Sequence, residues 1–130
     1  MRNIKFRGKS KCNGVWLYGD VVRNVEGAVA IVPPYEINTH NECRPYEVDT
    51  ETICEFTGQM LDGIEIYEHD LIECGKVLYE VVYDSYKCAF VLLSVLSQSY
   101  VTNPLGAVLN TFPCVHKGNI FDDIDKVKLK

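Results

Sequence analysis

Apolar and polar residues alternate in short segments of this chain, which is the pattern of half-buried β-strands. The clearest alternation covers Asn3–Arg7, where Ile4 and Phe6 share one face, and Val15–Arg23. Short apolar runs bounded by turn residues predict further strands. These runs are Ala28–Val32, Thr52–Phe56, Ile64–Tyr67, Asp70–Cys74, Val77–Tyr83 and Cys88–Leu93. No segment keeps a helical period over three turns.

Turn residues separate the predicted strands. The Asn-Gly pair at 13–14 and the Asp-Gly pair at 62–63 are typical of tight turns. The Pro-Pro pair at 33–34 ends a strand, because proline has no N–H to donate within a sheet. Many short strands at close spacing predict a mainly β fold of small, β-barrel-like sheets with few or short helices. The strand, acidic turn and strand that start at Ile64 make an SH3-like arrangement one form of this fold.

The last third of the chain is less regular. An Asn-Pro pair at 103–104 predicts a break, after which Leu105–Phe112 is expected to form another strand. Val95–Val101 suits either a short helix or a strand. Gly118 is expected in a turn, and Asp122–Lys128 suits either a helical turn or an extended tail.

The chain length of 130 residues suits a single domain, which we place at 1–130. A domain of this size buries roughly two-thirds of the surface of its unfolded chain, so it can build a core of its own. An N-terminal β segment at 1–50 and a barrel-like segment at 51–130 are its expected sub-parts.

Charge is unevenly distributed. The net charge is −5, but residues 1–23 hold six basic side chains and one acidic one, whereas residues 24–75 hold twelve acidic side chains and one basic one. A basic edge can contact phosphates, while the acidic middle repels duplex DNA. Candidate nucleic-acid contacts are Lys5, Arg7, Lys9, Lys11 and Arg23. Phe6, Trp16 and Tyr18 lie between them and suit stacking on single-stranded bases, although the alternation places Phe6 and Trp16 in the core.

Six cysteines raise the questions of disulfides and of metal. No two have the short spacing that lets one turn supply two zinc ligands. Cys54, Cys74 and Cys88 lie in apolar runs, where cysteine behaves as a small hydrophobic residue. The chain shows neither a secretory signal nor an apolar run of about twenty residues that crosses a membrane. We therefore expect reduced thiols, a cytoplasmic location and no membrane contact.

Residues suited to catalysis or metal binding are present but scattered. A metal site requires His69 to meet Cys114 and His116, which share one strand face. Acidic side chains are plentiful, as a hydrolase requires. The sequence lacks a glycine-flanked serine and a phosphate-binding glycine loop. No cofactor is expected, and a hydrolase or metal-dependent enzyme is the least supported alternative.

Tyrosine is frequent, with eight residues, and protein interfaces favour it. The polar segment Tyr35–Pro45 is the best candidate for a functional loop. The candidate interaction surface comprises Tyr35, His40, Tyr46 and Tyr86. Open strand edges in a small β protein also favour pairing between copies, so a homo-oligomer is expected.

Three blocks of the sequence together resemble the YopX family of phage and prophage proteins. The first comprises Lys-Phe-Arg-Gly at 5–8, Trp16 and Gly-Asp at 19–20. The second comprises Thr52, Thr-Gly at 57–58, Asp-Gly at 62–63, Ile-Tyr-Glu at 66–68 and Asp70. The third is Gly-Asn-Ile-Phe at 118–121. The blocks lie in the order of the family pattern and span most of the chain.

The chain also departs from the family pattern. His69 stands where the family commonly has glycine, the connection at 59–63 is shorter than usual, and Tyr35–Pro45 has no counterpart. The resemblance implies a small, largely β, intracellular protein of a phage or prophage. It carries over no catalytic residue, because the family has no established molecular role.

The sequence therefore predicts a phage- or prophage-encoded accessory protein of the host bacterial cytoplasm. Its expected role is that of a non-enzymatic interaction or assembly module that binds a host or phage protein. Binding of single-stranded nucleic acid through the basic N-terminal segment is the main alternative.

Overall fold

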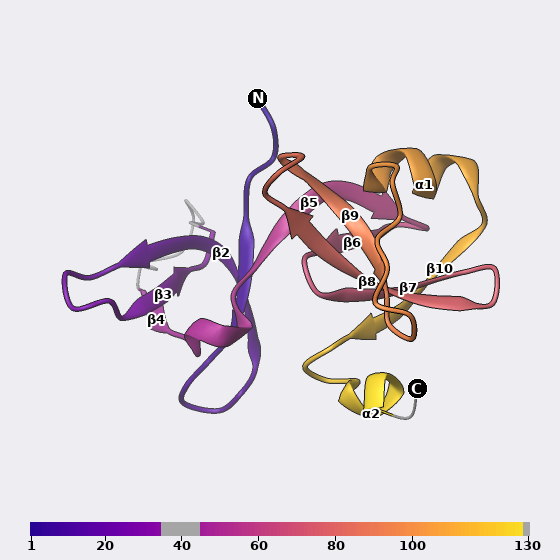
Figure 1. Ribbon diagram of the computed structural model, residues 1–130. Helices are drawn as coiled ribbons and strands as arrows, with labels where there is room; N and C mark the ends of the chain where they lie inside the picture. Colours follow the sequence, from indigo (N-terminus) through magenta and orange to yellow (C-terminus); the bar gives the residue numbers. More distant parts are fainter. Residues whose placement is uncertain (35–44, 129–130) are drawn as a thin grey trace. The chain divides into compact units, whose positions relative to one another are not determined.

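The computed structural model describes residues 1–34 and 45–128 (Figure 1). These residues are mainly β, as predicted, and their strands form antiparallel ladders that do not close into a barrel within the described part of the chain. Contacts divide the chain into two units, Met1–Phe56 and Thr57–Lys130. Nearly all of the expected Tyr35–Pro45 loop, with Tyr35 and His40, lies outside the described residues.

The first unit is an antiparallel sheet in the order β4-β3-β2-β1, continued by the start of β5 (Figure 1). Its strands are β1 (Phe6–Lys9), β2 (Trp16–Arg23), β3 (Val29–Val32), β4 (Tyr46–Glu47) and β5 (Cys54–Leu61). β2 pairs with two strands: its first half pairs with β1 and its second half with β3. The strand predicted at Thr52–Phe56 begins later than expected, because Thr50–Thr52 forms a 3-10 turn capped by Asp49.

Alternation along these strands builds a small core in the first unit. Val29, Ile31 and Val48 are buried at its centre, and Phe6 and Leu17 pack against them. The inward position predicted for Phe6 is therefore confirmed. Ile4, which was predicted to share the face of Phe6, precedes β1 and is half exposed.

The second unit contains a four-stranded antiparallel sheet in the order β10-β7-β8-β9, and the end of β5 pairs with β6. The strands are β6 (Ile64–Tyr67), β7 (Asp70–Cys74), β8 (Val77–Asp84), β9 (Ala89–Ser94) and β10 (Cys114–Asn119). The helices are α1 (Leu105–Thr111) and α2 (Ile124–Lys128). The predicted hairpin at 62–63 is present, and both of its residues have positive φ.

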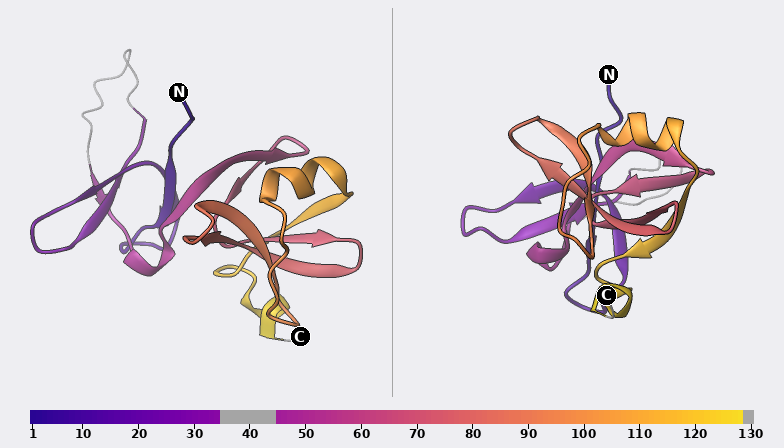
Figure 2. Two further views of the ribbon diagram at one scale, coloured as in Figure 1. Left: turned by 45° about the horizontal axis from the view of Figure 1, so that its top comes forward. Right: turned by 45° about the vertical axis from the view of Figure 1, so that its right-hand side comes forward.

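Helix α1 covers one face of the four-stranded sheet (Figure 2). Leu105 and Val108 of α1 are buried together with Ile72, Val81 and Leu92 from β7, β8 and β9. Ile72 pairs with Tyr79, which shares its face of β8 with Val81 two residues later, and Val81 pairs with Leu92. The three buried strand residues therefore lie on the same face of the sheet. The side chains that alternate with them point to the opposite face of the sheet.

The strand predicted at Leu105–Phe112 is wrong, since these residues form helix α1. Leu105, Val108 and Leu109 recur at the three- and four-residue spacing of one helix face, and all three pack into the core. At seven residues the helix is too short for its periodicity to stand out from a short apolar run. Asp122–Lys128 takes the helical alternative at its end, as α2. Val95–Val101 forms neither the helix nor the strand considered from the sequence. It is a turn in which Tyr100 makes an isolated bridge to Leu93 of β9.

A disulfide joins Cys74 at the end of β7 to Cys114 at the start of β10. The two residues are direct cross-strand partners, with their Cα atoms 4.4 Å apart. The expectation of reduced thiols is therefore wrong for this pair. The sequence hides the pair because 40 residues separate its members, and only the sheet register brings them together. Among the described cysteines, Cys12 and Cys88 are exposed free thiols.

Candidate functional site

A row of side chains crosses the face of the four-stranded sheet that α1 leaves uncovered. Val115 of β10 lies opposite Glu73 of β7, which lies opposite Leu78 of β8. Val95 directly follows β9 and continues the row, since its N–H donates to the carbonyl oxygen of Leu78 at 3.0 Å. The row therefore combines three apolar side chains with one carboxylate.

Lys117 reaches this region through a β-bulge in β10. His116 pairs with Ile72 and Gly118 pairs with Leu71, so the lysine between them has no partner residue on β7. Such an extra residue bends the strand and redirects its own side chain. The bulge thereby places an ammonium group beside the row.

The segment after β10 is fixed by a small network of hydrogen bonds. The side-chain oxygen of Asn119 accepts from the backbone N–H groups two and three residues further on, both at 2.9 Å. The carboxylate of Asp123 accepts from the N–H of Asn119 at 3.1 Å. Gly118 has a φ of 112°, and a Cβ there would overlap the Asp123 carboxylate. This segment leads into α2 and so positions Lys126.

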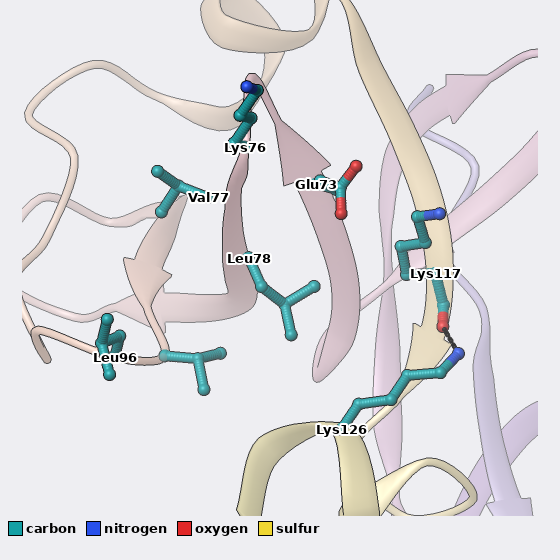
Figure 3. Close-up of a pocket in the computed structure, with 8 residues that line it drawn as sticks. Glu73, Lys76, Val77, Leu78, Leu96, Lys117 and Lys126 are labelled. Carbon is teal, nitrogen blue, oxygen red and sulfur yellow. Dashed lines mark hydrogen bonds between the residues drawn. The ribbon is translucent and has the colours of Figure 1, made fainter. Parts of the chain in front are cut away.

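A pocket of about 510 Å³ lies on this face of the sheet (Figure 3). We call it the lysine pocket, and its lining residues are Glu73, Lys76, Val77, Leu78, Val95, Leu96, Lys117 and Lys126. Leu78 and Val95 are half-buried members of the row, while Val77 and Leu96 are 42% and 69% exposed. Apolar surface inside the pocket is therefore left open to a ligand.

Positive charge dominates the lysine pocket, which has three ammonium groups and one carboxylate in its lining. Lys126 is partly engaged, because its Nζ donates to the carbonyl oxygen of Lys117 at 2.7 Å and lies 3.4 Å from an Asp123 carboxylate oxygen. Within residues 1–34 and 45–128, the side chains of Lys76 and Lys117 have no ion pair or hydrogen bond. Figure 3 shows Lys117 and Lys126 on one side of Glu73 and Lys76 at the other end of the pocket.

The lining of the lysine pocket suits the binding of a ligand. Its apolar side chains can bury the hydrocarbon part of a ligand, and its ammonium groups can pair with an anionic part. Among the described lining residues there is no histidine, serine or cysteine. The arrangement fits a ligand that is both apolar and acidic.

A second pocket of about 360 Å³ lies on the α1 side of the sheet. Its lining residues are Cys74, Gly75, Tyr79, Leu92, Val101, Val108, Phe112 and Pro113. Apart from the tyrosine hydroxyl, this lining offers only apolar side chains, so it carries little to select one ligand over another.

The acid–histidine pairs of the second unit brace its turns. Asp70 is fully buried, accepts from the N–H of Tyr67 at 2.8 Å and lies 3.2 Å from Nε2 of His116. His69 has a φ of 70° and contacts the carboxylate of Glu80 through Nδ1 at 2.7 Å. Its backbone N–H and carbonyl are also bonded, to β8 and to the segment after β10. These contacts hold the turn between β6 and β7.

The metal hypothesis receives no support from the part of the chain that the structure describes, which holds no group of three or more His, Cys, Asp or Glu side chains able to bind an ion. Cys114 is bonded to Cys74, His116 lies beside Asp70, and His69 lies beside a different carboxylate. The three ligands considered from the sequence therefore have separate partners.

The described residues of the predicted interaction surface lie in different units. Tyr46 belongs to β4 in the first unit and is 46% exposed. Tyr86 belongs to the turn between β8 and β9 in the second unit and is 96% exposed. Tyr35 and His40 are outside the described residues. The four-residue interaction surface therefore stays a prediction.

The basic N-terminal residues are engaged in contacts within the first unit. Arg7 is buried, with its guanidinium 4.6 Å from the centre of the Trp16 ring, and the Nζ of Lys9 lies 5.3 Å from the same ring. Lys5 stands over Phe56 at 4.9 Å, and Lys11 forms a 3.0 Å ion pair with Glu47 of β4. Arg23, the fifth candidate, lies at the end of β2, is exposed and pairs with β3 rather than with β1.

The sequence matches no protein-family model and no curated protein. Among the described residues, no helix is both long and apolar enough to cross a membrane.

Sequence reasoning missed the three lysines of the pocket. Lys76 lies in a hairpin turn, Lys117 in a bulge and Lys126 in a short helix, so the first and the last are 50 positions apart in the sequence. The one local signal was Gly118 after a lysine inside a strand-like run, which is typical of a bulge.

Proposed function

We propose that this protein is a non-enzymatic interaction module that binds an acidic and apolar segment of a partner protein in the lysine pocket. The observation that carries the proposal is that one pocket combines exposed apolar side chains with Lys76 and Lys117, which have no side-chain partner among residues 1–34 and 45–128. A partner segment that carries both glutamate or aspartate and valine, leucine or isoleucine suits the charged and the apolar parts of the pocket.

The biological setting belongs to the same proposal. The resemblance to the YopX family supports an accessory protein of a phage or prophage that works in the cytoplasm of the host bacterium. Its partner is then a host or phage protein. Short sheets with open edges support self-association as well, and sedimentation velocity over a range of concentrations tests that part.

The test uses a probe of defined chemistry, the fluorescein-labelled peptide Val-Glu-Val-Glu-Val with blocked ends. Fluorescence polarisation measures its Kd for the protein and for the K76E/K117E variant. Reversal of two rim charges removes two attractions and adds two repulsions, which amounts to about 2 kcal/mol, or about thirtyfold in Kd. The variant should fold normally, because neither ammonium group has a partner among the described residues.

The matched control is the R2E/R23E variant, which changes the net charge equally at two exposed side chains and leaves the lysine pocket intact. It should bind the probe as the unmodified protein does. An equal rise in Kd for both variants would attribute the effect to net charge. If the unmodified protein does not bind the probe, the proposal is refuted.

Single-stranded nucleic acid is the competing ligand class. A fluorescein-labelled oligothymidylate in the same assay should show no binding at physiological salt, because Arg7 is buried and Lys11 is paired within the first unit. Tight, salt-dependent binding of the oligonucleotide that K76E/K117E leaves unchanged would replace the peptide proposal with the nucleic-acid one.

A further inference from the structure

The β10 strand has a neighbour on one side only, because it stands at the end of the order β10-β7-β8-β9. In an antiparallel pair, residues whose Cα atoms are about 4.5 Å apart do not exchange backbone hydrogen bonds, and the next pair along does. Cys74 and Cys114 are such a narrow pair at 4.4 Å. Val115 and Glu73 therefore form the bonded pair, and His116 again belongs to a narrow one.

The backbone N–H and C=O groups of Cys114 and His116 consequently point away from β7, toward the open side of β10. Within the described part of the chain, neither residue has a backbone hydrogen bond on that side. Val115, between them, is 50% exposed, so this part of the strand is accessible. Two donors and two acceptors at alternate residues form the start of a ladder for an added strand.

We propose that the open edge of β10 receives the partner segment as an additional antiparallel β-strand, with its acidic side chains directed to the lysine pocket. This inference rests on the proposed function and adds the mode of binding to it. The partner's backbone bonds the edge at Cys114 and His116, and alternate side chains reach Lys117 and Lys126. Main-chain pairing with side-chain pockets for alternate residues is a recurring way to bind extended peptides.

The alternation assigns each partner residue to a role. Residues directly opposite Cys114 and His116 exchange backbone bonds with them, and their side chains lie on the face of the disulfide. Residues between them direct their side chains to the face of Val115 and Lys117, and their N–H groups point away from β10. Acidic residues therefore fit the second positions, on the face of the lysine pocket. Apolar residues fit the first positions, on the α1 side of the sheet where Cys114 belongs to the core.

Both ends of the docking edge are closed. Pro113 precedes it and has no N–H to offer. At the other end the bulge interrupts the strand, and the carbonyl oxygen of Lys117 is already bonded to Nζ of Lys126. The edge is thus a short site with two bonded positions, and the Cys74–Cys114 disulfide ties it to β7.

The test compares three versions of the Val-Glu-Val-Glu-Val probe by fluorescence polarisation. One version is unmodified, one is N-methylated on the valines and one on the glutamates. Methylation of the valines removes the N–H groups that face β10, so Kd should rise by about thirtyfold for two lost hydrogen bonds. Methylation of the glutamates should change Kd by less than about threefold, which controls for the stiffening that N-methyl groups introduce.

Amide hydrogen exchange supplies an independent readout on the whole protein. The amides of Cys114 and His116 should exchange rapidly in the free protein, while that of Val115 is protected by its bond to β7. The unmodified probe should slow both rapid amides by at least tenfold.

The outcomes separate the binding mode from the proposed function. Equal Kd values for all three probes, with K76E/K117E still weakening them, would refute strand addition and leave the lysine pocket as a side-chain site. A loss confined to the glutamate-methylated probe also refutes the antiparallel arrangement. Protection of the Cys114 and His116 amides by self-association, with no response to the probe, would show that a second copy occupies the edge. No binding of any probe overturns both proposals.

Discussion

The Cys74–Cys114 disulfide allows a quantitative prediction for the stability of the second unit. The bond closes a loop with a sequence separation of 40 residues. The chain-entropy relation gives a loss of unfolded-state entropy worth about 4 kcal/mol at room temperature for a loop of this length. The bonded protein should therefore unfold with a free energy larger than that of the reduced protein by about that amount.

Urea denaturation followed by circular dichroism measures this difference. The comparison includes the oxidised protein, the same protein in excess dithiothreitol, and the C74A/C114A variant. Reduction removes the cross-link without altering side-chain volume, whereas the variant also removes two sulfur atoms from the packed sheet. Cys114 is 8% exposed, so the variant should lose a further 1 kcal/mol or so from packing.

Thiol titration in denaturant keeps this prediction open to refutation. The oxidised protein should show two fewer reactive thiols than the reduced protein, and the missing pair should map to Cys74 and Cys114 by mass spectrometry of peptides. If the pair is bonded but reduction changes the unfolding free energy by less than about 1 kcal/mol, the loop-entropy reasoning fails. If all six cysteines titrate without reductant, the pairing itself is refuted.

Two further substitutions test how the second unit is built. Gly118→Ala should destabilise by about 2 to 3 kcal/mol in urea denaturation, because its φ is 112° and the new Cβ overlaps Asp123; Gly14→Ala, at a positive φ with open space around it, should cost about 1 kcal/mol. Asp70→Ala should cost about 3 kcal/mol because it leaves a buried N–H and a histidine without their carboxylate, whereas the exposed Asp125→Ala should change stability by less than about 0.5 kcal/mol. Equal effects within either pair would contradict the assigned contacts.

Local signals were sufficient for most of the strands. The bounds of Ile64–Tyr67 and Asp70–Cys74 follow from turn residues on both sides and agree with β6 and β7. Asp-Gly at 62–63 predicts its hairpin because both residues adopt positive φ there. Where the chain lacks such punctuation, as after Pro104, a short apolar run does not distinguish a seven-residue helix from a strand.

The candidate site could not be predicted in this way, because it depends on register. The side chain of Lys117 is directed by a bulge in β10 that is defined only by the pairing with β7. Lys76 lines the same pocket from the hairpin between β7 and β8. The cysteine pair is hidden for the same reason. Residue type and spacing indicated tyrosines and N-terminal basic residues as binding residues. The burial of Arg7 arises from tertiary packing, which cannot be predicted from composition.

Position 69 connects the backbone to the kinds of sequence change that this protein tolerates. His69 holds a left-handed conformation, which glycine adopts without strain and which asparagine, aspartate and histidine adopt more readily than other residues. A change between glycine and histidine there is chemically drastic but conformationally mild, and the Glu80 contact offsets part of its cost. Divergence at this position is therefore filtered by shape rather than by polarity or size. Neutral drift should pass among those four residues and exclude valine and isoleucine, whose branched side chains clash in that region.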